Sequence, residues 1–256
     1  MRLCAASDNR GAMSEPSIIL VRPQMAENIG AAARAMLNFG LTRMRLVAPR
    51  DGWPSEKATA MASGAGRILD QAGQFPDVAS AVEDFDYVFA TTARERYLTK
   101  PVMTPERAMA HARTLIGEGK RCAVMFGPER AGLENEDLVR ANALVRVPVN
   151  PEFPSLNLAQ CTLLLAYEWM RQTDDTPPEA LAMAGTEVAS QIEVEHLAQH
   201  FEERLDDAGY FFPDQKAAGM KLNLRNLWSR LPLTRADVQM LHGALRQLTR
   251  AAKQDD

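Results

Sequence analysis

A single long cation stands among small residues near the start of the chain. The segment ENIGAAARAM covers residues 27–36, and Arg34 is its one basic side chain. On a helix, Arg34 shares a face with Gly30, Ala31 and Asn38. These small neighbours leave room for a ribose and a phosphate, and a guanidinium can bind such oxygens with paired hydrogen bonds. Taken alone, the pattern equally fits a solvated arginine that lies along a helix surface.

Three further segments each follow an apolar run that is typical of a buried strand. They are TTARER at 91–96, GPERAGL at 127–133 and PVNPEFPSLN at 148–157. Gly127 and Gly132 allow the backbone to approach a ligand closely, and the prolines stiffen the loops. Together the three loops indicate one pocket built from backbone amides and carbonyls, which suits an adenine and a zwitterionic tail better than a phosphate. Each loop alone also fits a plain connection between a strand and a helix.

Other chemistries have little support in the residues. The segment GAGRIL at 64–69 lacks the third glycine of a dinucleotide-binding loop, and no P-loop or GxSxG motif occurs. His196 and His200 are one helical turn apart, but HLAQH lacks the glutamate of a metalloprotease. The three cysteines are scattered. We therefore expect no metal and no covalent nucleophile.

The elements that must position these residues alternate along the chain. Strands are predicted at 17–21, 44–48, 87–91, 122–126 and 143–149. Helices are predicted at 28–39, 55–69, 104–119, 134–140 and 156–172, with Gly40 after the end of the first, a break near the glycines of the second, and Ser155 as N-cap of the last. This alternation predicts an α/β fold with a mostly parallel sheet, in which ligands bind at the carboxyl ends of the strands.

The predicted helix at 156–172 is apolar on nearly all sides. Such a helix is either covered by a partner subunit or central in the core of a monomer. Both interpretations fit the pattern equally well, and the first predicts a subunit interface nearby.

Composition divides the chain further. With 46% hydrophobic and 24% charged residues, the chain is typical of a globular protein, and no apolar run suits a bilayer span or a secretory signal. We expect a flexible tail at 1–14, a main domain at 15–172, a linker at 173–186 and a helical extension at 187–256. The scattered cysteines favour a cytoplasmic location.

The net charge of −4 does not by itself indicate a nucleic-acid partner. However, eight Lys and Arg residues stand against three Asp and Glu from Lys216 to the end. Such a basic segment is either a face for phosphates or an ordinary solvated helix surface.

The motifs NIGAAARAM, FGPERAGL and VPVNPEFPSLNLAQ…AYE resemble, in order and spacing over 17–172, those of the SpoU branch of the SPOUT RNA methyltransferases. Within that branch, TTAR and GY…LNLRNLWSR are similar to segments of the bacterial tRNA (cytidine/uridine-2′-O-)-methyltransferases. Two departures are visible. Ala31 and Ala32 replace bulkier or hydroxylated residues, and Pro154 stands where relatives carry serine, which removes any hydroxyl contact at that position.

The resemblance implies a SPOUT fold with a C-terminal trefoil knot, a rare exception to unknotted topology. It implies S-adenosyl-L-methionine as cofactor and a homodimer with the active site at the subunit interface. The implied product is a tRNA whose nucleotide 32, in the anticodon loop, is methylated on the ribose 2′-oxygen. A basic row on the extension (Lys216, Lys221, Arg225 and Arg230, near Trp228) would hold the tRNA. Trp228 would stack on a base or fill a core.

The resemblance also assigns site residues. The implied catalytic set is Arg34, Asn28, Glu129, Ser155 and Asn157. The implied cofactor set is Thr91, Thr92, Ala93, Gly127, Val147, Pro154, Ser155, Leu156 and Asn157. Arg34 would orient the ribose, because a guanidinium with a pKa above about 12 is a poor base, and Glu129 would orient Arg34 or Asn28. For Ser155, helix capping is the structural alternative, and for Val147 and Leu156 a place in the core.

Three other functions remain open. The same domain would serve a methyltransferase that acts on another tRNA site or on ribosomal RNA, with only the extension differing. A non-catalytic RNA-binding protein would use the same scaffold, although the intact arginine and cofactor loops argue against it. A nicotinamide-dependent enzyme is disfavoured by the missing glycine fingerprint.

Overall fold

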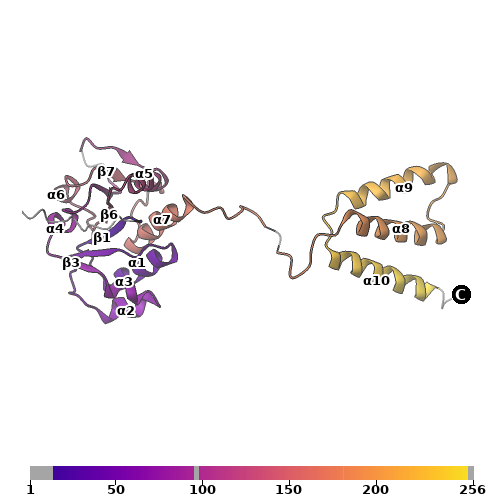
Figure 1. Ribbon diagram of the computed structural model, residues 1–256, viewed down its shortest axis with the longest axis horizontal. Coiled ribbons are helices and arrows are strands. Elements are labelled where there is room, and N and C mark those ends of the chain that lie inside the picture. Colours follow the sequence, from indigo (N-terminus) through magenta and orange to yellow (C-terminus); the bar gives the residue numbers. More distant parts are fainter. Residues whose placement is uncertain (1–13, 95–97, 181, 253–256) are drawn as a thin grey trace, which may run out of the picture. The chain divides into compact units, whose positions relative to one another are not determined.

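The computed structural model describes residues 14–94, 98–180 and 182–252 of the chain. It divides into two units, Met1–Thr176 and Pro177–Asp256 (Figure 1), and each is treated by itself.

The first unit is built on a parallel sheet with the strand order β3-β2-β1-β6-β4-β7-β5. All of its described pairings are parallel, which confirms the predicted α/β class. The strands are β1 (Ser17–Val21), β2 (Met44–Val47), β3 (Gly73–Phe75), β4 (Tyr87–Thr91), β5 (Val102–Met103), β6 (Cys122–Phe126) and β7 (Ala143–Val145). The two short strands β3 and β5 lie at the sheet edges, and the sequence pattern does not predict them. The knot expected from the resemblance stays a prediction.

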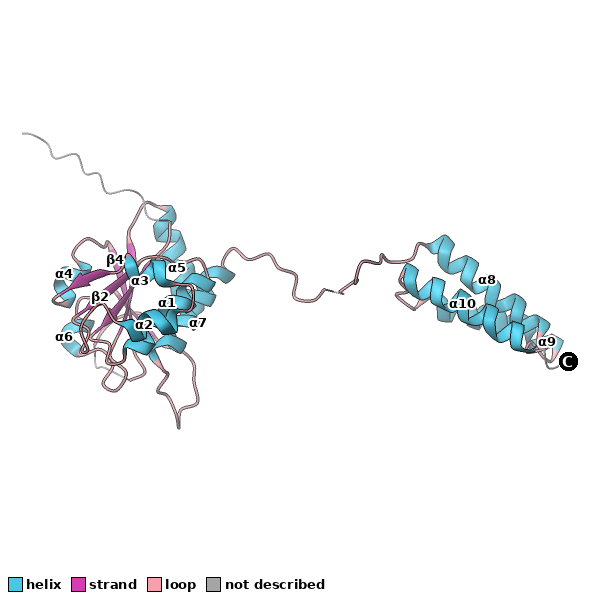
Figure 2. Cartoon of the chain, turned by 90° about the horizontal axis from the view of Figure 1, so that it is seen from below, coloured by secondary structure: helices cyan, strands magenta, loops and turns pink. Residues whose placement is uncertain are grey.

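Helices cover both faces of this sheet. They are α1 (Ala26–Asn38), α2 (Glu56–Ala62), α3 (Gly66–Asp70), α4 (Val78–Val82), α5 (Pro105–Gly117), α6 (Asn135–Leu138) and α7 (Leu158–Arg171). Figure 2 shows α4 and α6 on one side of the strands and α1, α2, α3 and α7 on the other. The period of two in a strand explains the two cores, because Ile18 and Leu20 point to one face of β1 while Ile19 and Val21 point to the other.

Glycines mark two helix boundaries that the sequence predicts. Gly40 follows α1 with a φ of +75°, a conformation that costs glycine little. The predicted break within 55–69 separates α2 from α3, where Ser63 and Gly64 have φ values of +44° and +93°. One predicted cap is wrong, because Asn157 rather than Ser155 caps α7.

The second unit contains α8 (Gln191–Asp207), α9 (Asp214–Ser229) and α10 (Arg235–Ala252). Its core consists of Leu197, Ala198, Trp228, Val238 and Leu245. Trp228 is only 8% exposed and packs against Phe201, so it is a core residue rather than a platform for a base. In the described part of the chain, no helix has the length and apolar character needed to cross a bilayer.

Candidate active site

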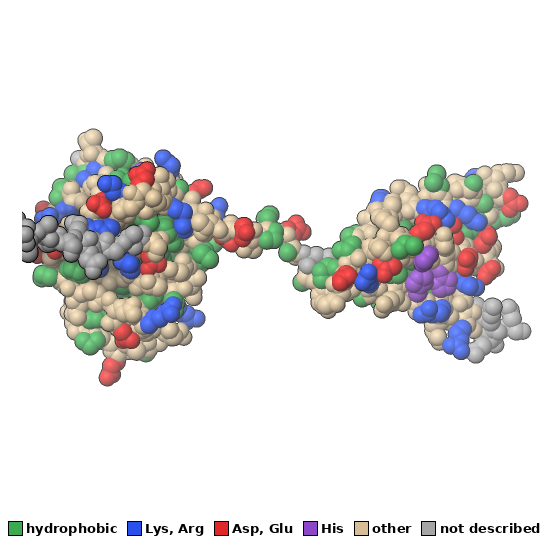
Figure 3. Space-filling model, viewed as in Figure 1, with side chains coloured by type: hydrophobic (Ala, Val, Ile, Leu, Met, Phe, Trp, Pro, Cys, Tyr) green, Lys and Arg blue, Asp and Glu red, His purple; other side chains and the backbone are tan. Residues whose placement is uncertain are grey.

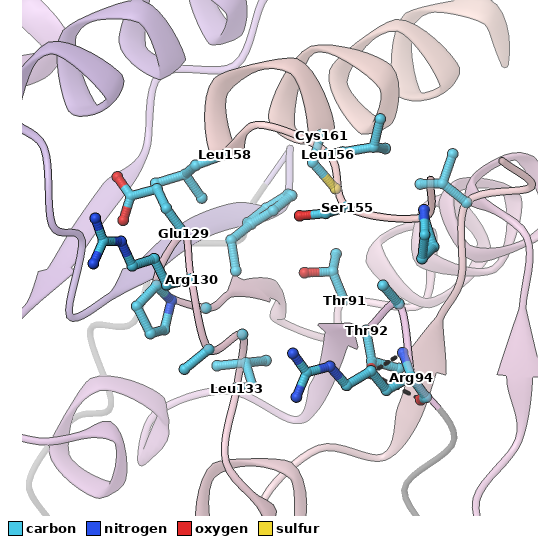
Figure 4. Close-up of a pocket in the computed structure, with 18 of the residues that line it drawn as sticks. Thr91, Thr92, Arg94, Glu129, Arg130, Leu133, Ser155, Leu156, Leu158 and Cys161 are labelled. Carbon is cyan, nitrogen blue, oxygen red and sulfur yellow. Dashed lines mark hydrogen bonds between the residues drawn. The ribbon is translucent and has the colours of Figure 1, made fainter. Parts of the chain in front are cut away.

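A cavity of about 210 Å³ lies at the carboxyl ends of β4, β6 and β7 (Figure 4). The three loops singled out by their sequences meet there. Among the cofactor residues expected from the resemblance, eight line it: Thr91, Thr92, Ala93, Gly127, Val147, Pro154, Ser155 and Leu156. Asn157 does not line the cavity. The parallel sheet explains the meeting, since it brings the ends of neighbouring strands to one edge.

Backbone contacts fix the shape of the first two loops. The Thr91 hydroxyl donates to the Met125 carbonyl at 3.1 Å, and the Thr92 amide donates to the Val145 carbonyl at 3.0 Å. A Cβ added at Gly127 would overlap the backbone of Gly132 and Leu133. Glycine at 127 therefore lets this loop fold back on itself. From the sequence, this glycine is explained by close approach of a ligand, whereas the structure explains it by close approach of the loop's own backbone.

The cavity combines apolar walls with hydroxyl and cationic groups. Apolar side chains from β6, β7 and α7 line it beside the predicted residues: Phe126, Val145, Leu158 and Cys161. Arg94 and Arg130, both exposed, lie on either side of Leu133 in Figure 4. The resemblance assigned none of these a role, although Arg94 ends the TTAR motif. Burial raises the pKa of Cys161 to about 12, so this thiol stays protonated.

Glu129 joins the middle loop to the start of α1. Its carboxylate accepts hydrogen bonds from the Gln24 amide at 2.8 Å, the Met25 amide at 3.2 Å and the Asn28 side chain at 2.8 Å. A carboxylate is favoured here, because the amino end of a helix carries partial positive charge. In the described residues, Glu129 contacts Asn28 but makes no hydrogen bond or ion pair with Arg34.

Asn157 extends the same network to α7. Its amide nitrogen donates to the Asn28 side-chain oxygen at 3.0 Å, and its own oxygen accepts from the Ala159 and Gln160 amides at 2.9 and 3.3 Å. Glu129, Asn28 and Asn157 thus tie together the three segments in which they lie. This arrangement leaves the exposed Ser155 without a capping role and inside the cavity lining.

Arg34 lies on the exposed side of α1 and does not line the cavity. Among the described residues, its guanidinium has neither a hydrogen-bond partner nor an ion-pair partner. The interpretation of Gly30 as space for a ligand is wrong, because a Cβ there would overlap the Ala58 carbonyl of α2. Gly30 allows two helices to pack closely, Ala31 is partly buried against the core, and Asn38 is exposed like Arg34.

One side of α7 is buried and the other is apolar but exposed. Leu158, Leu165 and Trp169 belong to the core. Leu163, Leu164, Tyr167 and Met170 are 36–46% exposed, and Phe39 at the end of α1 packs edge-on against Tyr167 with ring centroids 5.7 Å apart. The helix is therefore a core element that also presents an apolar surface.

Two of the four basic residues expected to form a row on the extension are paired, while Lys216 and Arg230 are exposed and form no ion pair within the described residues. Arg225 contacts Glu195 at 3.0 Å and Glu202 at 2.7 Å, and Lys221 contacts Asp206 at 3.4 Å. In the described part of the chain, no cluster of three or more His, Cys, Asp or Glu side chains is suited to hold a metal ion.

Each of the two units matches a model of a known protein family. The model of the SpoU rRNA Methylase family matches residues 15–167, and that of the tRNA methyltransferase TrmJ C-terminal domain matches residues 192–256. The tRNA (cytidine/uridine/adenosine-2′-O-)-methyltransferase TrmJ of Pseudomonas aeruginosa is 34% identical over 92% of this chain and 94% of its own length. A tRNA (cytidine/uridine-2′-O-)-methyltransferase TrmJ of Yersinia pestis is 33% identical over 93% and 91%.

A solved structure covers nearly the whole chain as well. The crystal structure of TrmJ from Z. mobilis ZM4 is 49% identical, with a TM-score of 0.79 over 92% of this chain and 99% of that one. The likeness therefore includes the extension as well as the sheet domain.

Proposed function

Because the chain belongs to the SpoU rRNA Methylase family, we propose that it is a tRNA 2′-O-methyltransferase that uses S-adenosyl-L-methionine. The proposed target is the ribose of a cytidine or uridine at nucleotide 32, in the anticodon loop. The observation that carries the proposal is the meeting of three loops on one cavity, tied through Glu129, Asn28 and Asn157 to the helix that bears Arg34. The relatives named above, which act on tRNA riboses, support the substrate class.

The residues around the cavity fit the proposed cofactor. Apolar walls and backbone groups suit an adenine ring, while hydroxyls and the exposed Arg94 suit the polar tail. When bound, S-adenosyl-L-methionine supplies a methyl group on a sulfonium. The protein has to hold the ribose hydroxyl in line with that group. Thr91, Thr92 and Ser155 line the cavity and are assigned to binding.

The proposed enzyme is a homodimer in which Arg34 of one copy serves the cavity of the other. Two observations support this arrangement. Arg34 is exposed and lies outside the cavity of its own chain, and α7 presents exposed apolar side chains that a second copy would cover. Arg34 then orients the ribose and its phosphate by hydrogen bonds, and the hydroxyl proton passes to phosphate or water.

The remaining residues of the implied catalytic set hold two helices in place. Glu129 and Asn28 hold the start of α1, and Asn157 holds the start of α7 against it. We assign methyl transfer to the domain at 15–172, which carries the proposed knot, and tRNA binding to the extension at 187–256 beyond a linker at 173–186. An enzyme with this substrate acts in the cytoplasm.

A single experiment tests this function. Purified full-length protein is incubated with a tRNA pool and with S-adenosyl-L-methionine that carries an isotopic label in its methyl group. The tRNA is then digested, and the fragments are sequenced by mass spectrometry. We expect the label on a 2′-oxygen at nucleotide 32.

Other outcomes identify the competing functions. Label at another tRNA position, or in ribosomal RNA supplied in parallel, reassigns the target but keeps the reaction. Calorimetry that detects no binding of S-adenosyl-L-methionine, together with retained RNA binding, identifies a non-catalytic RNA-binding protein.

A further inference from the structure

Three of the chain's four histidines lie in the second unit, and two of them are in direct contact. His200 of α8 and His242 of α10 stack with ring centroids 5.1 Å apart, and their Nδ1 atoms are separated by 2.8 Å. Figure 3 shows histidines as one patch on the surface of this unit, with Lys and Arg side chains beside it. His196, one turn before His200, is exposed and close enough to influence His242.

His200 of the pair lines a groove between α8 and α10, and His242 contacts it from α10. Side chains of both helices line the groove: His200, Arg204, Arg246, Gln247, Thr249 and Arg250. Arg246 and Arg250 follow His242 by one and two helical turns and are exposed. Within the described residues, neither forms an ion pair. Arg204 is held by Asp207 at 3.0 Å.

The two paired basic residues of α9 offer a weaker site for an anion. Arg225 and Lys221 already contact carboxylates of α8, so a phosphate would have to displace Glu195, Glu202 or Asp206. At the groove, Arg246 and Arg250 have no such competitor. Clustered guanidinium and imidazolium groups with free donors are the chemistry that binds phosphates.

We propose that the groove between α8 and α10 binds a phosphate of the RNA backbone, and that protonation of the His200–His242 pair strengthens this binding as the pH falls. The inference rests on the proposed function in one respect, namely that RNA is the substrate. It assigns the RNA contact of the extension to α8 and α10 instead of the basic row on α9.

The hydrogen bond between the two rings explains the pH dependence. An Nδ1–Nδ1 hydrogen bond requires one ring to donate and the other to accept, so at least one ring is unprotonated there. Burial, followed by the charges of His200, Arg246 and His196, lowers the pKa of His242 below its ordinary value. A bound phosphate acts in the opposite direction, because it favours the protonated rings.

The other charged groups around the pair have both signs. On α8 the groups are Arg204, paired with Asp207, and the exposed Glu203. On α10 they are Arg246 and Arg250. Within the described residues, the ion pairs of α9 are made with Glu195, Glu202 and Asp206 on another face of α8. RNA binding therefore takes up protons, and affinity rises as the pH falls from the pKa of the complex to that of the free protein.

The test measures binding of a fluorescent tRNA transcript to the full-length protein by anisotropy. Affinities are determined at several salt concentrations, and at about pH 6 and about pH 8 with constant ionic strength. Replacing both arginines (R246Q/R250Q) should weaken binding about tenfold at about 0.15 M salt and reduce the salt slope by about 2. The comparison variant K216Q/R230Q removes the same charge from two exposed positions, one on α9 and one directly after it, and should change affinity less than about threefold.

The variant H200Q/H242Q, which keeps polar side chains at both positions, tests the contribution of the histidines to the pH dependence. Wild-type protein should bind about fivefold more tightly at about pH 6 than at about pH 8, and the variant should lose most of this difference. Thermal unfolding checks that each variant is folded. If R246Q/R250Q does not fold, the single variants R246Q and R250Q replace it, and each should weaken binding and reduce the salt slope by about 1. Unchanged affinity of both single variants then counts as unchanged affinity of the double variant.

Three results overturn the proposal: unchanged affinity of R246Q/R250Q, an equal or larger loss in K216Q/R230Q, or an unaltered pH response in H200Q/H242Q. The proposed function is judged separately by methyl transfer from labelled cofactor to the same transcript. If RNA binding depends on the groove but no methyl group is transferred, the proposed function is wrong and the proposed RNA-binding groove stands. If methyl transfer is normal but RNA binding does not depend on the groove, the proposed RNA-binding groove is wrong and the proposed function stands.

Discussion

Arg34 and Glu129 use their charges in different ways. The Glu129 carboxylate accepts hydrogen bonds from three donors at the start of α1, so its charge stabilises one backbone conformation there. Arg34 lies on the exposed side of the same helix without an intramolecular partner in the described chain. A long cation with free donors is suited to a ligand, whereas a satisfied carboxylate is suited to structure.

Replacing Arg34 by alanine should reduce methyl transfer about 100-fold or more, because an orienting charge at the ribose is lost. Cofactor affinity and the thermal midpoint should stay near those of the wild type, since the side chain is exposed. Single-turnover kinetics, calorimetry and thermal unfolding measure the three quantities. Arg43→Ala is the matched control, because Arg43 is an exposed arginine at the opposite, amino-terminal edge of the sheet. Near-normal turnover in Arg34→Ala would remove this residue from the mechanism.

Replacing Glu129 by alanine should lower the free energy of unfolding by about 1–3 kcal/mol, because three donors lose their acceptor. Denaturant titration measures the loss. Methyl transfer should fall as well, since Asn28 loses its partner. Glu118→Ala provides the control, because Glu118 is exposed near the amino end of β6, away from the cavity. Equal stabilities of the two variants would show that the Glu129 network is not structural.

At the scale of helices, close packing of α1 on α2 depends on Gly30. A methyl group at this position should destabilise the protein by about 1–3 kcal/mol, because it would overlap the Ala58 carbonyl. The matched control is Gly219→Ala on α9, where a Cβ meets nothing within 4 Å and should stabilise the helix by about 0.5–1 kcal/mol. Denaturant titration of both variants checks the opposite signs. A neutral Gly30→Ala would mean that α2 moves aside without cost.

The exposed apolar side of α7 leads to a prediction about assembly. Leu164→Glu places a charge among Leu163, Tyr167 and Met170, and should convert the proposed dimer to a monomer. Light scattering after size exclusion measures the mass. Leu222→Glu on α9 is the control, because Leu222 is 69% exposed in the other unit. A monomeric wild-type protein, or a dimer unaffected by Leu164→Glu, would contradict the assignment of this surface.

At the scale of the whole chain, each unit has a separate hydrophobic core. The cores of the first unit draw on residues between Ile18 and Trp169, and that of the second on residues between Leu197 and Leu245. No described core residue is shared, so each unit has the means to fold without the other.

A fragment that ends at Thr176 should therefore stay folded and bind S-adenosyl-L-methionine with unchanged affinity. Its affinity for tRNA should fall about tenfold or more, because the proposed phosphate contacts of the extension are lost. Calorimetry and filter binding, each with the full-length protein alongside, measure the two affinities. Unchanged tRNA affinity of the fragment would assign RNA binding to the first unit alone.

Local patterns in the sequence were sufficient for the order of the main elements and for the three loops. Apolar runs, helical periodicity and the glycines at 40 and 64 depend on near neighbours, so they can be read without a fold. The short edge strands Gly73–Phe75 and Val102–Met103 have too few residues to carry a period, and only their pairing partners define them.

The tertiary structure alone decided which residues meet across long stretches of chain. Asn28 contacts Asn157, 129 positions away, and His200 contacts His242, 42 positions away. The carboxylates that neutralise Arg225 lie on a different helix. Such partners depend on how elements pack, and packing is a property of whole surfaces that no local pattern contains. The sequence by itself thus determined the kinds of side chain available for binding, and the fold decided which of them remain free to bind.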